Sequence, residues 1–246
     1  MGKVIVVVSG KGGTGKTTSV GAVASCLAAM GHKTLCLDGD IGLRNLDITL
    51  GMSDFAIIDF ADVVSGHIEL ASAVVQHPEI DNLFFLTAPS VGMPSEINEA
   101  ELRGLYDKVR DEYEYCFIDA PAGIGPGFRL VSQGADMAIV VVTGDLSSVR
   151  DGQRVVAELE AMGVEEIQLL VNRVRPSNFR RLKSTIDDII NSVGARILGI
   201  VKEDKAVILA ANLEIPLVLY ENKHAAAQFL KIARRLKGEN VPISKR

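Results

Sequence analysis

Short apolar runs alternate along the chain with longer segments whose apolar residues recur at helical spacing. A short run of apolar, β-branched or aromatic residues between turn residues is typical of a buried strand. Such runs predict strands at residues 4–8, 33–37, 83–87, 115–119, 136–143, 167–172, 195–201 and 217–219. The helical spacing predicts helices at residues 16–30, 57–75 (one or two short helices), 95–111, 146–161, 178–192, 204–212 and 223–237.

This regular strand–helix order predicts a single α/β domain over residues 1–246, built as a doubly wound, mostly parallel sheet with helices on both faces. The run at 136–143 is almost entirely apolar, so we expect a central strand that is buried on both faces. Residues 223–237 form the final predicted helix, and residues 238–246 form a short tail. No linker, repeat or low-complexity segment divides the chain.

Composition and charge narrow the class of protein. The 246 residues are 48% apolar and 23% charged, which is ordinary for a globular domain. The net charge of −5 disfavours a protein that binds DNA through a basic surface. The cysteines Cys26, Cys36 and Cys116 stand singly in apolar runs, which predicts buried thiols in a cytosolic protein. Neither a secretory signal nor a run of about 20 apolar residues is visible, so we expect a cytoplasmic protein.

The first predicted strand leads into a glycine-rich segment that carries the most specific motif of the chain. Gly10 to Thr17 reads Gly-Lys-Gly-Gly-Thr-Gly-Lys-Thr and fits the phosphate-binding loop G-x-x-x-x-G-K-[ST]. Its glycines let backbone N–H groups surround phosphate oxygens, and the following helix adds the positive end of its dipole. We expect Lys16 to reach the β- and γ-phosphates and the Thr17 hydroxyl to contact Mg²⁺. The predicted nucleotide-binding residues of this segment are Gly10, Lys11, Gly12, Gly13, Thr14, Gly15, Lys16, Thr17 and Thr18.

The same glycines admit a second interpretation. Residues 10–15 also satisfy the dinucleotide fingerprint G-x-G-x-x-G, with Asp38 and Asp40 at about the right distance along the chain. That interpretation predicts a Rossmann oxidoreductase and leaves residues 16–18 without a role. We therefore favour the phosphate-binding loop.

Two predicted strands end in carboxylates on the side of the sheet where the phosphate-binding loop is expected. Asp38 and Asp40 follow the second strand, before a loop expected at 42–47, and Asp119 ends the fourth strand, before Ala-Pro-Ala-Gly. Ligands of open α/β sheets gather at the carboxyl ends of strands. Asp119 fits the Walker B position, which holds Mg²⁺ next to a loop that senses the γ-phosphate. The alternative for Asp38 and Asp40 is a turn closed by a side-chain hydrogen bond.

Four segments together resemble the MinD/ParA family of P-loop ATPases, and the resemblance covers nearly the whole chain. They are residues 10–18, the stretch from Asp38 to Asp47, the stretch Asp119-x-Pro121-Ala122-Gly123 and the stretch Asn172-Arg173-Val174-Arg175-Pro176. The similarity is closest to the MinD branch, which positions the bacterial division site. Two stretches carry it: Gly-Leu-Arg-Asn-Leu-Asp at 42–47, and Val-Arg-Asp at 149–151 within the helix predicted at 146–161. The resemblance implies a P-loop NTPase of the SIMIBI type.

The resemblance also implies how the site residues act. Lys11 corresponds to the deviant lysine of this family, which reaches across a dimer interface to the partner's ATP phosphates. Two nucleotides would then be enclosed in a symmetric homodimer that forms in the ATP state and dissolves after hydrolysis to ADP and phosphate. Lys11, Lys16 and Asp40 are the expected catalytic residues, and Asp40 would orient the attacking water. The expected Mg²⁺ ligands are Thr17, Asp38 and Asp119.

Further along the chain, three residues are expected near the nucleotide. Asn45 would support the region that switches between nucleotide states, and Asn172, followed by Arg173, offers amide groups suited to an adenine edge. The guanine motif [NT]-K-x-D is absent, since the stretch Asn-Lys-His-Ala at 222–225 lacks the acid. We therefore expect ATP and ADP with Mg²⁺ as the ligands, and not GTP.

Partners follow from the same resemblance. The helix that bears Asp151 would form part of the surface that meets a MinC-like inhibitor and an activating partner; alternatively, Asp151 stabilises the start of that helix through its charge. Partition ATPases of the ParA type bind DNA through a basic surface, and the flagellar-number regulator usually carries an extra motif before its first strand, so both fit less well. The nitrogenase iron protein needs cysteine pairs that this chain lacks.

The end of the chain departs from the family pattern. MinD proteins usually end in a basic amphipathic helix that inserts into membranes, which would make the protein peripheral on the inner face of the cell membrane. Here the last predicted helix carries one apolar stripe, which we expect to pack in the core: Ala226, Phe229, Leu230, Ala233 and Leu236. The tail offers too little apolar surface for more than marginal membrane binding. Either the native protein is longer, or it does not hold membranes by itself.

Overall fold

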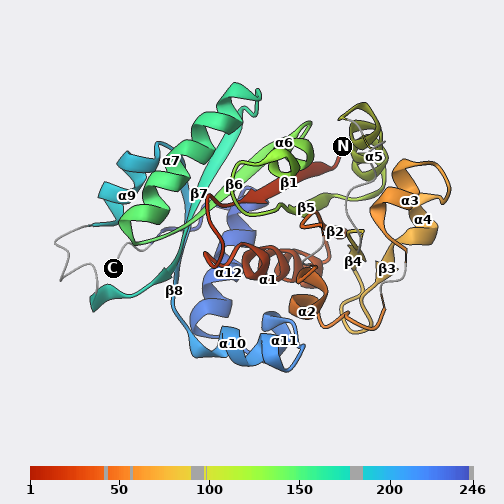
Figure 1. The fold of residues 1–246 in the computed structure, drawn as a ribbon. Helices are drawn as coiled ribbons and strands as arrows, with labels where there is room; N and C mark the ends of the chain where they lie inside the picture. The colour runs from red at the N-terminus through yellow and green to blue at the C-terminus, as the bar shows by residue number, and fades with distance from the viewer. Residues whose placement is uncertain (42–43, 56–57, 90–96, 98, 178–184, 244–246) are drawn as a thin grey trace.

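The structure, a computed structural model, describes residues 1–41, 44–55, 58–89, 97, 99–177 and 185–243. The strands within these residues are β1 Lys3–Val8, β2 Thr34–Asp38, β3 Val75–Gln76, β4 Leu83–Leu86, β5 Tyr115–Asp119, β6 Met137–Thr143, β7 Glu166–Val174 and β8 Arg196–Lys202. They form a single eight-stranded sheet in the order β3-β4-β2-β5-β1-β6-β7-β8 (Figure 1). Neighbouring strands are parallel, except that β3 is antiparallel to β4.

Helices cover both faces of this sheet. They are α1 Lys16–Ala29, α2 Leu46–Leu50, α3 Phe60–Val64, α4 Leu70–Ala73, α5 Glu99–Glu112, α6 Pro126–Ser132, α7 Leu146–Ala161, α9 Ile186–Val193, α10 Lys205–Asn212, α11 Leu217–Tyr220 and α12 His224–Leu236. One face carries α1, α2 and α10 to α12, and the other carries α3 to α7 and α9 (Figure 1). The predicted doubly wound, mostly parallel α/β fold is confirmed.

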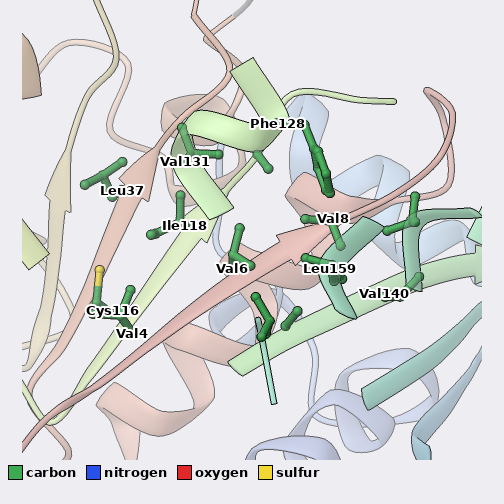
Figure 2. Close-up of a cluster of buried hydrophobic side chains, with 14 of the residues drawn as sticks. Val4, Val6, Val8, Leu37, Cys116, Ile118, Phe128, Val131, Val140 and Leu159 are labelled. Carbon is green, nitrogen blue, oxygen red and sulfur yellow. The ribbon is translucent and has the colours of Figure 1, made fainter. Parts of the chain in front are cut away.

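Alternate residues of β1 point into two separate cores, as the period of a strand requires. Val4, Val6 and Val8 lie on the side of α6 and α7, in the core that also holds Phe128 (Figure 2). The residues between them pack on the other face, against α1 and α12. Strand β6, beside β1, is likewise buried on both faces, as its apolar run predicts. The cysteines are buried free thiols, also as expected.

The run of apolar residues at 217–219 is predicted as a strand, and this prediction is wrong. Leu217–Tyr220 forms the short helix α11, in which the N–H groups of Leu219 and Tyr220 donate to the carbonyl oxygen of Pro216. Leu217 is buried in the same core as α1. A short apolar run is compatible with a buried turn of helix as well as with a strand, and here packing against α1 decides between them.

Some other elements differ from the prediction or lie partly outside the described residues. The sequence pattern does not predict β3, α2 or α6. The helix α2 begins at Leu46, inside the segment 42–47 that we expected as a loop. Residues 42 and 43 of that segment lie outside the described residues. The helices expected at 95–111 and 178–192 are seen as α5 and α9. Their predicted first residues (95, 96 and 98 in one, 178–184 in the other) lie outside the described ranges.

The final helix, α12, packs on the sheet and on α1. Ala226, Phe229 and Ala233 are buried in the core, as expected from the apolar stripe, whereas Leu230 is 40% exposed. The stripe is therefore mainly a core surface. Within the described ranges, none of the helices combines the length and the apolar content needed to cross a membrane.

Candidate active site

The segment between β1 and α1 is a tight loop that depends on glycine. Gly13 and Gly15 have φ angles of 79° and 89°, in the left-handed region that favours glycine. A Cβ atom at Gly15 would lie 2.2 Å from Nδ2 of Asn172, and one at Gly10 would lie 2.4 Å from Cβ of Asp151. The loop backbone therefore approaches β7 and α7 too closely to admit side chains at these two positions. Because α1 begins directly after the loop, its N-terminus favours an anion here.

Lys16 and Asp119 form a buried ion pair where α1 begins and β5 ends. Lys16 Nζ lies 2.6 Å from Oδ1 of Asp119, and the two side chains are 7% and 1% exposed. Burial raises the pKa of Asp119, while Lys16 and a hydrogen bond from Thr17 act to lower it. The fold thus brings the lysine of the phosphate-binding loop to the acid that ends β5.

Asp38 lies beside Asp119, because β2 and β5 pair in parallel with these two residues in register. The fully buried carboxylate of Asp38 accepts hydrogen bonds from the N–H groups of Asp40, at 2.9 Å, and Leu46, at 3.3 Å. The first of these closes the turn considered above as an alternative, so Asp38 both forms the turn and faces Asp119. Burial raises the pKa of Asp38 to about 7, and the charge of Asp119 adds to the shift. Two buried carboxylates side by side favour a cation.

The oxygen donors at this place fit Mg²⁺. The hydroxyl of Thr17 and the carboxylates of Asp38 and Asp119 are hard ligands of the kind that Mg²⁺ prefers. Over the described residues, no group of three or more His, Cys, Asp or Glu side chains is placed to hold a metal. Mg²⁺ commonly uses one or two protein carboxylates and completes its shell with water and phosphate oxygens. The donor set therefore fits Mg²⁺ that is bound together with a phosphate.

A cavity of about 500 Å³ opens beside the loop. Predicted site residues that line it, besides residues 12–18, are Asp40, Asn45, Asn172 and Arg173. Its lining does not include Gly10, Lys11, Asp38 or Asp119. Burial raises the pKa of Asp40, while Lys16 acts to lower it. The cavity is also lined from the end of β8, from α10 and from α12 by residues that the sequence does not predict for the site: Val201, Lys202, Glu203, Asp204, Val207, Ile208 and Phe229. The rule that ligands gather at the carboxyl ends of strands could have located the end of β8.

Lys11, predicted to contact phosphates across a dimer interface, lies against α7 in this structure. Its Nζ is 2.7 Å from Oδ1 of Asp145 and 2.9 Å from Oγ of Ser147. Partial burial acts to raise the pKa of Asp145, but hydrogen bonds from Lys11, Thr143 and Ser147 outweigh it and hold that pKa well below its usual range. Asp145 is also the N-cap of α7, where it accepts a hydrogen bond from the N–H of Ser148. Asp145 is not among the residues predicted for the site.

Asp151 does not lie at the start of its helix. α7 begins at Leu146 with Asp145 as its cap, so Asp151 lies in the second turn. The alternative of a charge that stabilises the helix start is therefore wrong for Asp151. Its Cβ instead faces the backbone of Gly10, which places this part of α7 directly against the glycine loop.

Comparison with known proteins identifies the family of this chain. The model of the CobQ/CobB/MinD/ParA nucleotide binding domain matches residues 5–217. The chain belongs to this family. The septum site-determining protein MinD of Bacillus subtilis is 37% identical over 246 residues, which cover 99% of this chain and 92% of that protein. The MinD of Synechocystis sp. is 36% identical over 245 residues, with 99% and 92% covered.

Solved structures of family members share the fold. The MinC:MinD cell division protein complex of Aquifex aeolicus contains a chain with 34% identity and a TM-score of 0.91, with 98% of each chain covered. The septum site-determining protein MinD of Pyrococcus horikoshii, complexed with Mg-ADP, has 26% identity and a TM-score of 0.84, with 97% of each chain covered. A ParA family ATPase from Chlorobium tepidum, with 20% identity and a TM-score of 0.81, shares the fold alone.

Proposed function

We propose that this protein is a MinD-like ATPase that acts as an ATP-dependent switch in bacterial division-site placement. The observation that carries this proposal is the buried pair of Lys16 and Asp119, in a chain that is 37% identical to the septum site-determining protein MinD of Bacillus subtilis. A lysine of the phosphate-binding loop beside a strand-terminal acid is the arrangement used for phosphoryl transfer from nucleotides. The relative from Pyrococcus horikoshii, complexed with Mg-ADP, supports ATP, ADP and Mg²⁺ as the ligands.

The cavity offers groups for both the phosphates and the base of a nucleoside triphosphate. The loop N–H groups and Lys16 would bind the phosphates, and the side chains of Val207 and Ile208 offer an apolar surface for a flat base. Asn172 donates through Nδ2 to the carbonyl oxygen of Thr14, at 2.9 Å. Its Oδ1 is an acceptor that suits the amino group of adenine, so we keep Asn172 as the proposed adenine contact.

In ATP hydrolysis, each site residue would have a role that follows from its position. Mg²⁺, when bound, supplies positive charge that neutralises the phosphates. Asp38 and Asp119 would hold the ion with Thr17, and Lys16 would exchange Asp119 for phosphate oxygens. Asp40 borders the cavity, where its carboxylate would orient the attacking water and accept its proton. The raised pKa of Asp40 suits that role, because it brings proton acceptance closer to neutral pH.

Nucleotide state would control assembly. In the proposed ATP state, Lys11 leaves Asp145 and contacts the phosphates held by a second copy, which closes a homodimer; hydrolysis then dissolves it. The Aquifex aeolicus MinC:MinD complex supports a MinC-like partner for this chain. We propose the surface around Asp151 on α7 for that partner and for an activating partner, since it adjoins the glycine loop.

We further propose that residues 1–246 act as one domain in the cytoplasm. The described strands form one sheet, and α12 packs back on α1, which supports a single unit. A switch driven by ATP needs access to the cytoplasmic pool of nucleotide. Peripheral association with the inner face of the cell membrane, expected of the family, would then depend on the nucleotide state, because dimerisation doubles the number of contacts.

Phosphate release from ATP tests this function. We expect release that requires Mg²⁺, that uses ATP and not GTP, and that falls by more than about tenfold in Lys16→Gln, which removes the charge at the phosphates. Thermal unfolding of Lys16→Gln serves as the folding control. Failure to release phosphate from ATP, together with binding of NADH, would support the oxidoreductase interpretation instead.

A further inference from the structure

Two consecutive residues at the end of β7 hold two consecutive carbonyl groups of the phosphate-binding loop. Nδ2 of Asn172 donates to the carbonyl oxygen of Thr14, and Nη1 of Arg173 donates to that of Gly13, each at 2.9 Å. Neither carbonyl belongs to the regular hydrogen bonding of α1, which begins only at Lys16. The loop is therefore fixed from outside by side chains of another strand.

This contact determines where the loop's N–H groups point. In a trans peptide the C=O and the N–H point in opposite directions, and the described residues contain no cis peptide bond. With the carbonyl groups of Gly13 and Thr14 held towards β7, the N–H groups of Thr14 and Gly15 point away from β7. An anion site of the nest type requires convergent N–H groups of this kind. The two side chains from β7 thus preset the loop for phosphate.

Arg173 is itself held by a residue that comes directly after the neighbouring strand. Glu203, which follows β8, accepts from Nη2 of Arg173 through Oε1 at 3.2 Å, and its Oε2 contacts Nε of Arg175. Arg173 has a φ angle of 53°, in the left-handed region that costs a non-glycine residue energy. Its side chain is 49% exposed, so without a fixed partner the guanidinium would be free to turn to solvent. The Glu203 side chain, 25% exposed, restricts that freedom.

We propose that Glu203 is a positioning residue for the phosphates: acting through Arg173, it holds the phosphate-binding loop in its anion-binding conformation. The inference rests on the proposed nucleotide function. Glu203 also lines the cavity near the end of β8. Through Arg173 it therefore connects this part of the cavity wall to the phosphate-binding loop. Glu203 touches no phosphate itself in this account, and its effect passes through one guanidinium.

Binding of Mg-ADP and of inorganic pyrophosphate with Mg²⁺, measured by titration calorimetry on the full chain, tests the proposal. We expect Glu203→Gln and Arg173→Gln each to weaken both ligands by about fivefold to tenfold, as loss of a charge-assisted hydrogen bond allows. The double variant should bind no more weakly than Arg173→Gln alone, because Glu203 acts through Arg173. Arg175→Gln is the matched control: it also loses a contact to Glu203 but leaves the loop untouched, so it should bind like the wild type.

The outcomes separate this inference from the proposed function. If the wild type binds neither Mg-ADP nor pyrophosphate, the nucleotide function itself fails. If the wild type binds both and Glu203→Gln binds equally well, only the inference fails. Weakening of Mg-ADP without weakening of pyrophosphate would place the effect of Glu203 at the base or ribose and would also overturn it. Thermal unfolding of each variant without ligand checks that the fold is retained.

Discussion

Nζ of Lys11 lies 2.7 Å from Oδ1 of Asp145, so one copy of the chain holds its own predicted intersubunit lysine against the cap of α7. The two side chains are 36% and 51% exposed, and a pair this exposed is a weak restraint. A weak restraint can be exchanged for phosphate oxygens when a second copy brings them. The Lys11–Asp145 contact would therefore act as a weak brake on assembly: it would oppose formation of the homodimer, and little free energy is needed to break it.

Replacing Asp145 by asparagine tests this brake. Asparagine caps a helix about as well as aspartate, so Asp145→Asn keeps the start of α7 and removes only the charge. We expect the homodimer with Mg-ATP to form at a protein concentration about twofold to fivefold lower than for the wild type, which is the range for an exposed ion pair. Sedimentation over a concentration series measures this. Ser147→Ala, which removes only the neutral contact, should change assembly less; unchanged or weaker assembly of Asp145→Asn would refute the brake.

Two glycines of the loop, Gly12 and Gly15, should respond differently to replacement by alanine. Gly15→Ala places a Cβ 2.2 Å from Nδ2 of Asn172 at a φ angle of 89°, so both strain and overlap result. We expect a loss of about 2 kcal/mol or more in the free energy of unfolding, measured by urea denaturation without nucleotide. Gly12→Ala is the control, because a Cβ there meets no atom within 4 Å, and we expect a change of less than about 0.5 kcal/mol. Equal losses in both variants would contradict this account of Gly15.

The Lys16–Asp119 pair predicts strong coupling between the two side chains. Lys16→Met alone leaves a buried carboxylate without its cation, and we expect it to lower the free energy of unfolding by about 3 kcal/mol. Asp119→Asn alone leaves a buried ammonium without its partner. In Lys16→Met/Asp119→Asn both charges are gone, so the loss should be clearly smaller than the sum of the two single losses. Additive losses in urea denaturation would mean that the pair does not interact in the unliganded protein.

A buried histidine predicts how stability responds to acid. Nδ1 of His77 accepts hydrogen bonds from the N–H groups of Glu79 and Ile80, and Nε2 lies 2.9 Å from the carbonyl oxygen of Leu50. The ring must therefore be neutral, and burial lowers its pKa from 6.5, although the contact to Leu50 and the charge of Glu79 oppose the shift. The unfolded chain takes up a proton more readily than the folded one. The stabilisation that the neutral His77 ring provides is thus complete above pH 6.5. It is lost as the pH falls from 6.5 towards the lower pKa that His77 has in the folded chain.

Comparison with a variant isolates this contribution. His77→Gln cannot titrate, so its free energy of unfolding should fall less steeply than that of the wild type between about pH 7 and about pH 5. His32→Gln is the control, since His32 lies at the surface beside Glu114 and not among buried N–H groups. Parallel curves for the wild type and His77→Gln would show that His77 titrates alike in the folded and unfolded chain.

The sequence predicts most of the fold because each central strand, like β1, is buried on both faces and therefore reads as an unbroken apolar run. It fails where packing decides between two structures for one short run, as at Leu217–Tyr220. The two-residue strand β3 gives no periodic signal at all, because its pairing with β4 is a property of the assembled sheet.

The residues of the site likewise fall into those that the sequence predicts and those that only the fold reveals. The motif spacing predicts Lys16, and the ends of the apolar runs predict Asp38 and Asp119; the fold brings the three together. Glu203 and Asp145 carry no motif. They matter because of which strand or helix lies next to the loop, and only the folded chain shows that Glu203 meets Arg173 and that Asp145 meets Lys11.

The central claim is an ATP-gated homodimer, and its most direct test is the oligomeric mass in solution with Mg-ATP against Mg-ADP. The wild type and Asp40→Ala are measured side by side by sedimentation. The account predicts a monomer with Mg-ADP, a dimer with Mg-ATP, and a longer-lived dimer for Asp40→Ala, because removal of the proposed water-orienting carboxylate slows hydrolysis. A mass that is the same in both nucleotides would contradict the account, and Lys11 would then be an ordinary residue of the phosphate-binding loop.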